Sequence, residues 1–155
     1  MASIVQFSKN MRKRGQQVLQ GESRLVKRVA KGILKNLVTM SPADTGRMRS
    51  NYRVSVGGTA TAVISPYAPG KGLGMGERAN ANAAYNVGKA KIDAIAGRIT
   101  KSIKISNNVP YLDIVNSGRV KQTEPFFIER AIELGKREGL KNFKIFPPYN
   151  GDELD

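Results

Sequence analysis

Residues 22–40, ESRLVKRVAKGILKNLVTM, carry the strongest secondary-structure signal in the chain. Apolar residues recur there at four-residue steps, at Leu25, Val29, Ile33 and Leu37. Lysine and arginine fill the opposite side, so the stretch predicts an amphipathic helix with one buried face. Ser41-Pro42 ends this helix, because proline cannot continue the helical hydrogen bonds and restricts the residue before it.

The apolar stripe of this helix continues toward the N-terminus at heptad spacing, through Ile4, Met11 and Val18. Gly15 and Gly21 interrupt that stretch. A glycine inside a helix costs about 1 kcal/mol relative to alanine. We therefore expect either a bend near these glycines or two separate helices.

After the proline, alternating apolar and polar side chains predict β-strands. The segment YRVSV, residues 52–56, is followed by Gly57-Gly58 and then by TATAVIS. This is the pattern of a strand, a two-residue turn and a second strand, and it predicts a β-hairpin over residues 51–65. A third strand is predicted in TKSIKIS, residues 100–106, where isoleucine alternates with polar residues.

The remaining segments predict helices that pack on this sheet. Small side chains at helical spacing predict a helix over residues 80–98, and residues 107–118, NNVPYLDIVNSG, predict a turn followed by a short helical turn ended by Gly118. Thr123 is predicted to cap a last helix beginning at Glu124-Pro125. That helix has an apolar face made of Ile128, Ala131, Ile132 and Gly135.

Two segments are too poor in apolar residues to form a core of their own. Residues 66–80 are rich in glycine and proline and are predicted to be a mobile loop within a single domain, residues 1–140. Residues 141–155 are predicted to be an extended C-terminal arm that carries Phe143 and Phe146. From the sequence, this arm packs either on its own domain or on a neighbouring copy.

The composition excludes several classes of active site. The 155 residues include no cysteine and no histidine, which rules out disulfides, thiolate zinc sites and triads that use histidine. The glycine spacing fits neither a dinucleotide fingerprint nor a P-loop. We expect no catalytic residue, no cofactor and no metal. No membrane span or secretory signal is visible, so the chain is expected to be made in a cytoplasm without a membrane partner.

The triplet Asp44-Thr45-Gly46 also occurs in aspartic proteases, where two such aspartates share a proton. Here the triplet occurs once and is followed closely by Arg47 and Arg49. A structural turn is the better interpretation: the Asp44 carboxylate accepts backbone N–H groups, and Gly46 lets the chain turn sharply. The turn would couple the long helix to the first strand.

The formal net charge is +14, and the first 50 residues hold eleven lysines and arginines but only Glu22 and Asp44 as acids. Such a field favours polyanions, so the partner could be nucleic acid or an acidic protein surface. The candidate contacts for DNA or for an acidic partner are Lys9, Arg12, Lys13, Arg14, Lys27, Arg28, Lys31 and Lys35.

Two stretches resemble a family of small tailed-phage proteins described as tail-completion, minor tail or neck (head–tail joining) proteins. TMSPADTGRMRSNYRVSVG, residues 39–57, is similar to the segment that follows the first helix in that family. VPYLDIVNSGRVKQTEPFFIERAIE, residues 109–133, is similar to a second motif of the family. The chain departs from the pattern at Asn116, where the family usually has an acidic residue, at Glu124, and in a longer loop after the first strands.

The resemblance implies an α+β fold with a long N-terminal helix, a small antiparallel sheet with a hairpin, packed helices and an extended arm. It implies a non-enzymatic subunit of a homo-oligomeric ring, hexameric or dodecameric, between a portal or adaptor and a tail-tube or terminator protein. The expected location is the virion neck, and the host cytoplasm before assembly. A tail-terminator or head-closure subunit is the nearest alternative, and a basic nucleic-acid-binding module is a further one.

A closed ring needs a heterologous interface, in which two different faces of the subunit meet. The candidate interface residues come from the second motif and from the arm. They are Tyr111, Gly118, Lys121, Pro125, Phe126, Phe143 and Phe146.

Overall fold

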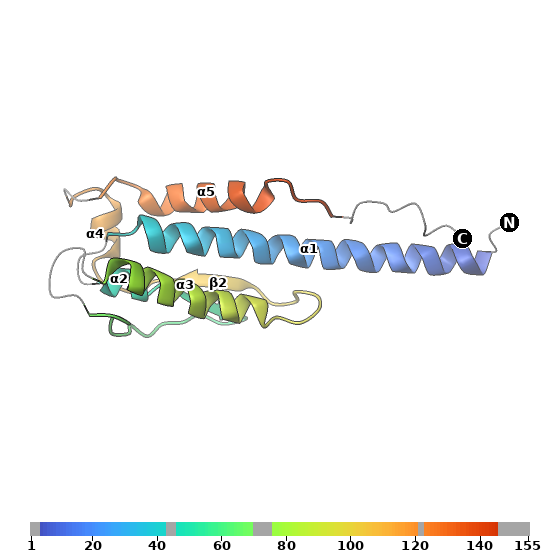
Figure 1. Ribbon diagram of the computed structural model, residues 1–155, viewed down its shortest axis with the longest axis horizontal. Helices are drawn as coiled ribbons and strands as arrows, with labels where there is room; N and C mark the ends of the chain where they lie inside the picture. The colour runs from blue at the N-terminus through green and yellow to red at the C-terminus, as the bar shows by residue number, and fades with distance from the viewer. Residues whose placement is uncertain (1–3, 43–45, 70–75, 121–122, 146–155) are drawn as a thin grey trace.

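The computed structural model describes residues 4–42, 46–69, 76–120 and 123–145. The fold is α+β, as predicted from the sequence: a long N-terminal helix, a two-stranded antiparallel sheet and further helices surround one core. Helix α1, Ile4–Met40, is the longest element, and the others lie beside its C-terminal half (Figure 1).

Helix α1 runs through both glycines as one helix of 37 residues, so the predicted bend or break is wrong. Helix formation is cooperative, and a cost of about 1 kcal/mol at each of two positions does not interrupt a long hydrogen-bonded ladder. Gly21 also has a packing role. A Cβ atom at this position would lie 2.8 Å from the carbonyl oxygen of Ile145, so the glycine allows the C-terminal segment to approach.

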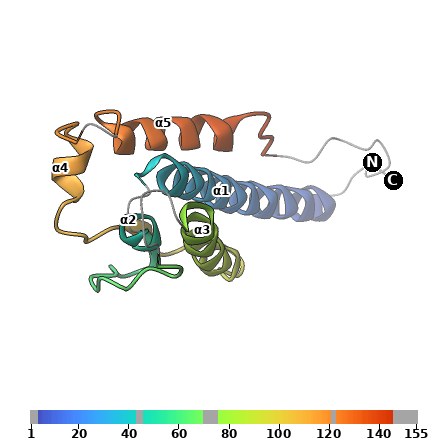
Figure 2. The same cartoon turned by 60° about the vertical axis from the view of Figure 1, so that its left-hand side comes forward.

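Helix α5, Phe127–Leu140, runs antiparallel to α1 on one side, and α3, Glu77–Asp93, lies on another side (Figures 1 and 2). Glycines allow both contacts. A Cβ atom on Gly135 would overlap the backbone of Ile33, and one on Gly88 would lie 2.5 Å from the Leu34 side chain. The glycines therefore let α5 approach the backbone of α1 and let α3 pack closely on the Leu34 side chain.

The sheet pairs two distant segments. Strand β1, Arg53–Val56, is antiparallel to β2, Ile103–Ser106, with Val54 opposite Ile105. The strand predicted over residues 100–106 is confirmed, but the hairpin over 51–65 is wrong. In residues 59–65 the only large apolar side chains, Val63 and Ile64, are adjacent and would face opposite sides of a strand, whereas Ile103 and Ile105 share one face and pack on the core.

Residues 59–65 instead cover the sheet through side-chain hydrogen bonds. The Asn51 amide donates to the Ile64 carbonyl at 2.9 Å and accepts from the Ile64 N–H at 2.7 Å. The Ser106 hydroxyl donates to the Ala60 carbonyl at 2.9 Å. A buried amide and a half-buried hydroxyl thus replace the expected backbone ladder.

The predicted helix over 80–98 is present with different ends, Glu77–Asp93. It starts at Gly76, whose φ of 73° is the left-handed conformation that glycine favours. The short helical turn is confirmed as α4, Leu112–Asn116, and Gly118 follows it with φ of 77°.

The start of α5 differs from the prediction. Thr123 does not cap the helix; its hydroxyl is buried without a hydrogen-bond partner among the described residues. The helix begins at Phe127, and the Asn116 side chain accepts the Ile128 N–H at 3.0 Å. The cap therefore comes from α4, a contact between segments that local sequence patterns do not predict.

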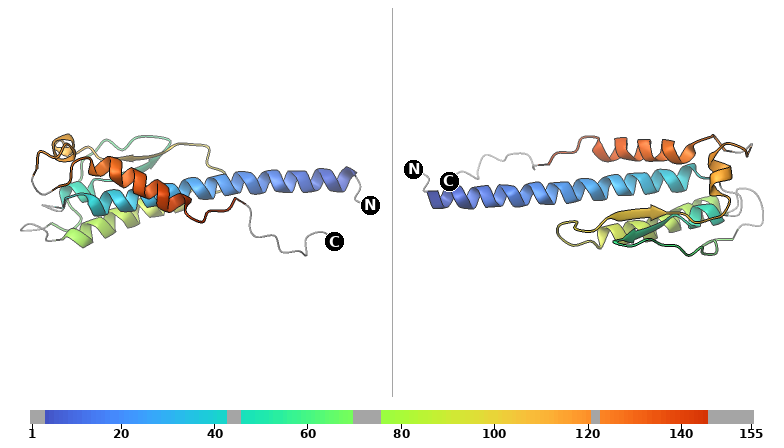
Figure 3. Two further views of the ribbon diagram at one scale, coloured as in Figure 1. Left: turned by 90° about the horizontal axis from the view of Figure 1, so that it is seen from above. Right: turned by 180° about the vertical axis from the view of Figure 1, so that it is seen from behind.

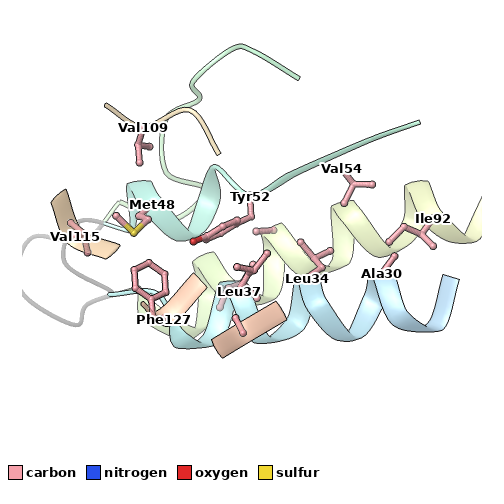
Figure 4. Packing of buried hydrophobic residues seen from close by; sticks show 14 residues of the cluster. Ala30, Leu34, Leu37, Met48, Tyr52, Val54, Ile92, Val109, Val115 and Phe127 are labelled. Atoms are coloured by element: carbon pink, nitrogen blue, oxygen red, sulfur yellow. The ribbon is translucent and has the colours of Figure 1, made fainter. Parts of the chain in front are cut away.

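The core lies around the C-terminal half of α1 (Figure 4). Leu34, Leu37 and Val38 of α1 meet Met48 of the short helix α2, Arg47–Ser50, and Phe127 of α5. The core residues that α1 contributes all lie at or after Ala30. The N-terminal half of the helix adds none of the described core.

Candidate subunit interface

The N-terminal half of α1, residues 4–20, projects beyond α5, α3 and the sheet in every view (Figures 1 and 3). Its apolar stripe is exposed: Ile4 is 87% accessible, Phe7 64% and Met11 55%. Neighbouring positions at i, i+3 and i+7 share one face of a helix. The projecting segment therefore presents an apolar face to solvent.

The same segment is strongly basic. Lys9, Arg12, Lys13 and Arg14 lie within it, and it contains no acidic residue. Lys9 and Lys13 lie about 160° around the helix from Met11, since each is two residues away. The segment thus has an apolar side and a side that carries Lys9, Arg12 and Lys13, while Arg14, about 60° from Met11, lies at the edge of the apolar side.

The basic candidates in the C-terminal half of α1 largely bind the chain itself. The Lys27 ammonium donates to the Ile95 carbonyl, and the Arg28 guanidinium donates to the Lys141 carbonyl at 2.7 Å. Lys31 forms an ion pair with Asp93 at 2.8 Å, while Lys35 is exposed. The basic residues predicted to contact a polyanion therefore form two separate groups. Four of them lie together on the projecting segment.

The Lys31 pair has a titration consequence. Asp93 also accepts from Lys89 at 2.8 Å, and these two hydrogen bonds to ammonium groups lower the pKa of Asp93 to about 2. The side chains are 29–46% exposed, so solvent screens the pairs. They join α1 to α3 on the surface.

An open apolar groove of about 610 Å³ lies between α1, α5 and strand β2. Its floor is the C-terminal half of α1, where Val29 and Ile33 continue the stripe that begins at Ile4. Ile128 and Ile132 form the α5 wall, and Ile105 belongs to the sheet wall. The sequence predicts the apolar faces of these elements but not the space left between them.

Tyr52 lies at the polar end of this groove with Asn107. Its hydroxyl is hydrogen-bonded to that of Ser41 at 2.8 Å. Burial raises the pKa of Tyr52 to about 12, because the phenolate loses hydration; hydrogen bonds from Ser41 and Asn107 oppose this shift. Tyr52 is therefore a neutral structural side chain over the pH range in which most proteins are stable.

The joint between α4 and α5 contains most of the other candidate interface residues. Phe126 is 61% exposed and has φ of 58°, a left-handed conformation that is uncommon for a bulky residue. Its N–H donates to the Asn116 carbonyl at 2.7 Å, which holds the turn. Pro125 is exposed and contacts Gly118, where a Cβ atom would lie 2.7 Å from the proline side chain.

The other predicted interface residues have different surroundings. Tyr111 is half-buried and packs against the core, and Phe143 is half-buried in the segment that follows α5. That segment binds its own α1, since the Arg24 guanidinium donates to the Ile145 carbonyl at 3.1 Å. Lys121 and Phe146 lie outside the described residues, as do the rest of the predicted arm and the centre of the predicted mobile loop.

Gly46 is the one described member of the predicted Asp-Thr-Gly turn; Asp44 and Thr45 lie outside the described residues. Gly46 has φ of 74°, and a Cβ atom there would overlap the Asn80 amide. Asn80 is fully buried: its amide oxygen accepts from Ser50 and from the Ala68 N–H, and its NH₂ donates to the Ala68 carbonyl. This asparagine joins the corner to α3.

Arg49 is a second buried polar residue near this corner. It donates to the Ser41 carbonyl at 2.8 Å and forms an ion pair with Glu77 at 2.9 Å. Neither Asn80 nor Arg49 was predicted as a structural centre. A signal for Asn80 was its position among alanines in a helical stretch, where an asparagine has poor helix propensity.

Within the described ranges, no three histidine, cysteine or acidic side chains are grouped so that they could hold a metal ion. None of the helices in these ranges is both long and apolar enough to cross a lipid bilayer. Comparison of the chain with protein-family models, with curated proteins and with solved structures found no match.

Proposed function

We propose that this chain is a structural subunit of a tailed-phage neck, in which copies form a ring that joins the head to the tail. The observation that carries this proposal is the distribution of exposed apolar side chains. Ile4 and Phe7 lie at one end of the elongated chain, and Phe126 and Ile114 lie at the other (Figure 1). Different exposed apolar faces at opposite ends suit heterologous contacts, which form a ring when the rotation between neighbouring subunits closes.

The positions of the two family-like motifs support the same proposal. The first motif, residues 39–57, turns the chain from α1 into β1. The second, residues 109–133, forms the joint between α4 and α5, including the exposed Phe126. Both motifs thus make connections that set the relative positions of the elements, a structural task that needs no catalytic group.

In the proposed assembly the ring, hexameric or dodecameric, contacts a portal or adaptor on one side and a tail-tube or terminator protein on the other. The chain would be located in the virion neck and, before assembly, in the host cytoplasm. The basic side of the projecting segment would face DNA in the channel or an acidic surface of a neighbouring protein. A tail-terminator or head-closure position is the alternative within the same particle.

A specific observation favours a second candidate, a basic nucleic-acid-binding module. Four basic side chains lie within six residues, 9–14, of a projecting helical segment, residues 4–20, whose own sequence contains no acidic residue. Non-specific DNA binding would be steeply salt-dependent, because each phosphate contact releases counterions. Tight, sequence-selective binding at physiological salt would favour this candidate over the ring subunit.

Purified virions test the proposed function directly. We expect quantitative mass spectrometry to find this chain at the copy number of one ring per particle, and a reconstruction of the neck to contain it. Infectious particles that lack the chain would refute the proposal. Density at the distal end of the tail tube or directly on the portal would instead assign the terminator or head-closure position.

A further inference from the structure

We infer that the groove between α1, α5 and β2 binds the N-terminal segment of α1, residues 4–20, from a second copy of this chain. The inference deepens the proposed ring function, and rests on it for the closure of the assembly. The contact itself follows from two apolar surfaces that the described residues leave uncovered on one molecule. One is the stripe of Ile4, Phe7 and Met11; the other is the groove.

The chain cannot fill its groove with its own N-terminal segment. Residues 4–20 and the groove floor belong to one uninterrupted helix, Ile4–Met40. At the usual rise of an α-helix, Met11 and Val29 are roughly 27 Å apart along its axis. A helix cannot bend back onto itself without breaking, so this segment reaches only the groove of another molecule.

The chemistry of the two surfaces matches. Ile4, Phe7 and Met11 stand at i, i+3 and i+7, which is the anchor spacing of a helix that lies in an apolar groove. Val18 and Leu25 continue the same heptad into the groove floor. Side chains at heptad spacing are suited to helix-on-helix packing, and the walls offer the aliphatic residues Ile128 and Ile132.

The projecting segment also needs a partner for its own stability. Its first turn has no acid, and Lys9 is followed at i+3 and i+4 by Arg12 and Lys13. Like charges at this spacing disfavour an isolated helix, and a first turn without an acid lacks the favourable interaction with the helix dipole. Packing of its apolar side on a second copy would offset these effects and leave Lys9 and Lys13 on the outer side.

Engineered cysteines test the contact, because the chain has no cysteine of its own. Met11→Cys and Ile132→Cys chains are purified separately as full-length protein, mixed and exposed to mild oxidant. We expect a mixed disulfide between the two chains. The matched control is Gln16→Cys, which is exposed on the same segment but about 140° around the helix from Met11; it should give at least tenfold less mixed disulfide with Ile132→Cys.

A charged residue introduced on the projecting segment tests the same contact by a second measurement and leaves the groove residues unchanged. Met11→Glu should lower the association constant at least about tenfold, because an unpaired carboxylate is costly inside an apolar groove. Met11 is exposed in the single chain, so this variant should fold as the parent does. Gln16→Glu, which adds the same charge on the other side, should associate nearly as well as the parent.

The outcomes separate this inference from the proposed function. Oligomers that form without the Met11–Ile132 disulfide would overturn the docking inference and leave the ring proposal standing. So would an Ile132 site that becomes reactive only when residues 146–155 are removed, since the chain's own end would then fill the groove. A bound apolar small molecule in native mass spectrometry, without the mixed disulfide, would also overturn it. Absence of the chain from virions, with the disulfide present, would refute only the neck function.

Discussion

The apolar stripe of α1 runs through both halves of the helix, but the two halves have different surroundings. After Gly21 the stripe meets α5, α3 and the sheet, and Leu34 and Val38 are almost completely buried. Before Gly21 the same pattern is exposed at Phe7 and Met11. Periodicity therefore predicts which side of a helix is apolar, and only the presence of other elements determines whether that side is core or interface.

The largest contrast between the halves is expected from truncating one apolar side chain in each. Leu34→Ala should lower the free energy of unfolding by about 2–5 kcal/mol, because it leaves a cavity between α1, α3 and β1. Met11→Ala should change it by less than about 0.5 kcal/mol, since the side chain is exposed in the single chain. Urea unfolding at a concentration where the chain is monomeric measures both. Equal losses would show that the N-terminal half is part of the monomer core.

Replacing one glycine by alanine in each region should change the free energy of unfolding in opposite directions. Gly135→Ala places a methyl group against the Ile33 backbone and should destabilise the fold by about 1–3 kcal/mol. Gly15→Ala meets no atom within 4 Å and should stabilise the helix by about 0.5–1 kcal/mol. Thermal unfolding of the two variants beside the parent is the measurement. Stabilisation by Gly135→Ala would mean that α5 can shift away from α1.

The free energy of unfolding should depend on alkaline pH through Tyr52, whose hydroxyl is hydrogen-bonded to Ser41 directly after the C-terminal end of α1. Its pKa is raised to about 12 in the folded chain, so the unfolded chain loses this proton first. The stabilisation is complete below the ordinary tyrosine pKa and is lost as the pH rises through the folded value. Between about pH 9 and about pH 11 the parent should lose on the order of 1 kcal/mol more than Tyr52→Phe. Identical pH profiles for the two proteins would contradict the burial of this hydroxyl.

The smallest effect is expected from the surface ion pairs that join the C-terminal half of α1 to α3 and surround Asp93. Asp93→Asn should cost less than about 1 kcal/mol at neutral pH, because Lys31 and Lys89 lose a screened partner. The pKa of Asp93 is lowered to about 2, so this stabilisation is present above the ordinary aspartate pKa and is lost as the pH falls through about 2. Urea unfolding at neutral and acidic pH, with Asp113→Asn as the control for charge, measures it. A difference that persists at the lowest pH would be unrelated to ionisation.

Several elements could be predicted from local residues alone. The helix over 22–40, the strand around Ile103 and Ile105 and the short helix before Gly118 were all read from periodicity and turn residues. The wrong predictions concern choices between distant partners. The first strand pairs with β2 across about fifty residues instead of with its neighbour, and Asn116 caps α5 in place of Thr123.

The candidate interface likewise combines features that could be predicted from the sequence with features that only the fold determines. Charge counting identified Lys9, Arg12, Lys27 and Lys31 as one basic group, but the fold leaves the first two on the projecting segment and bonds the last two to Ile95 and Asp93. The groove was not predicted, because its walls come from three elements far apart in the chain. Nor were the buried Asn80 and Arg49, whose partners become neighbours only in the folded chain.

The sequence by itself determined the α+β class, the helix-forming stretches, the apolar stripe along α1 and the excess of positive charge, since each depends on the order and spacing of nearby residues. The tertiary structure decided which part of that stripe is covered, which cations bind the chain itself and where an open groove remains. The physical reason is that burial and pairing depend on which distant segments meet, and local periodicity carries no information about that.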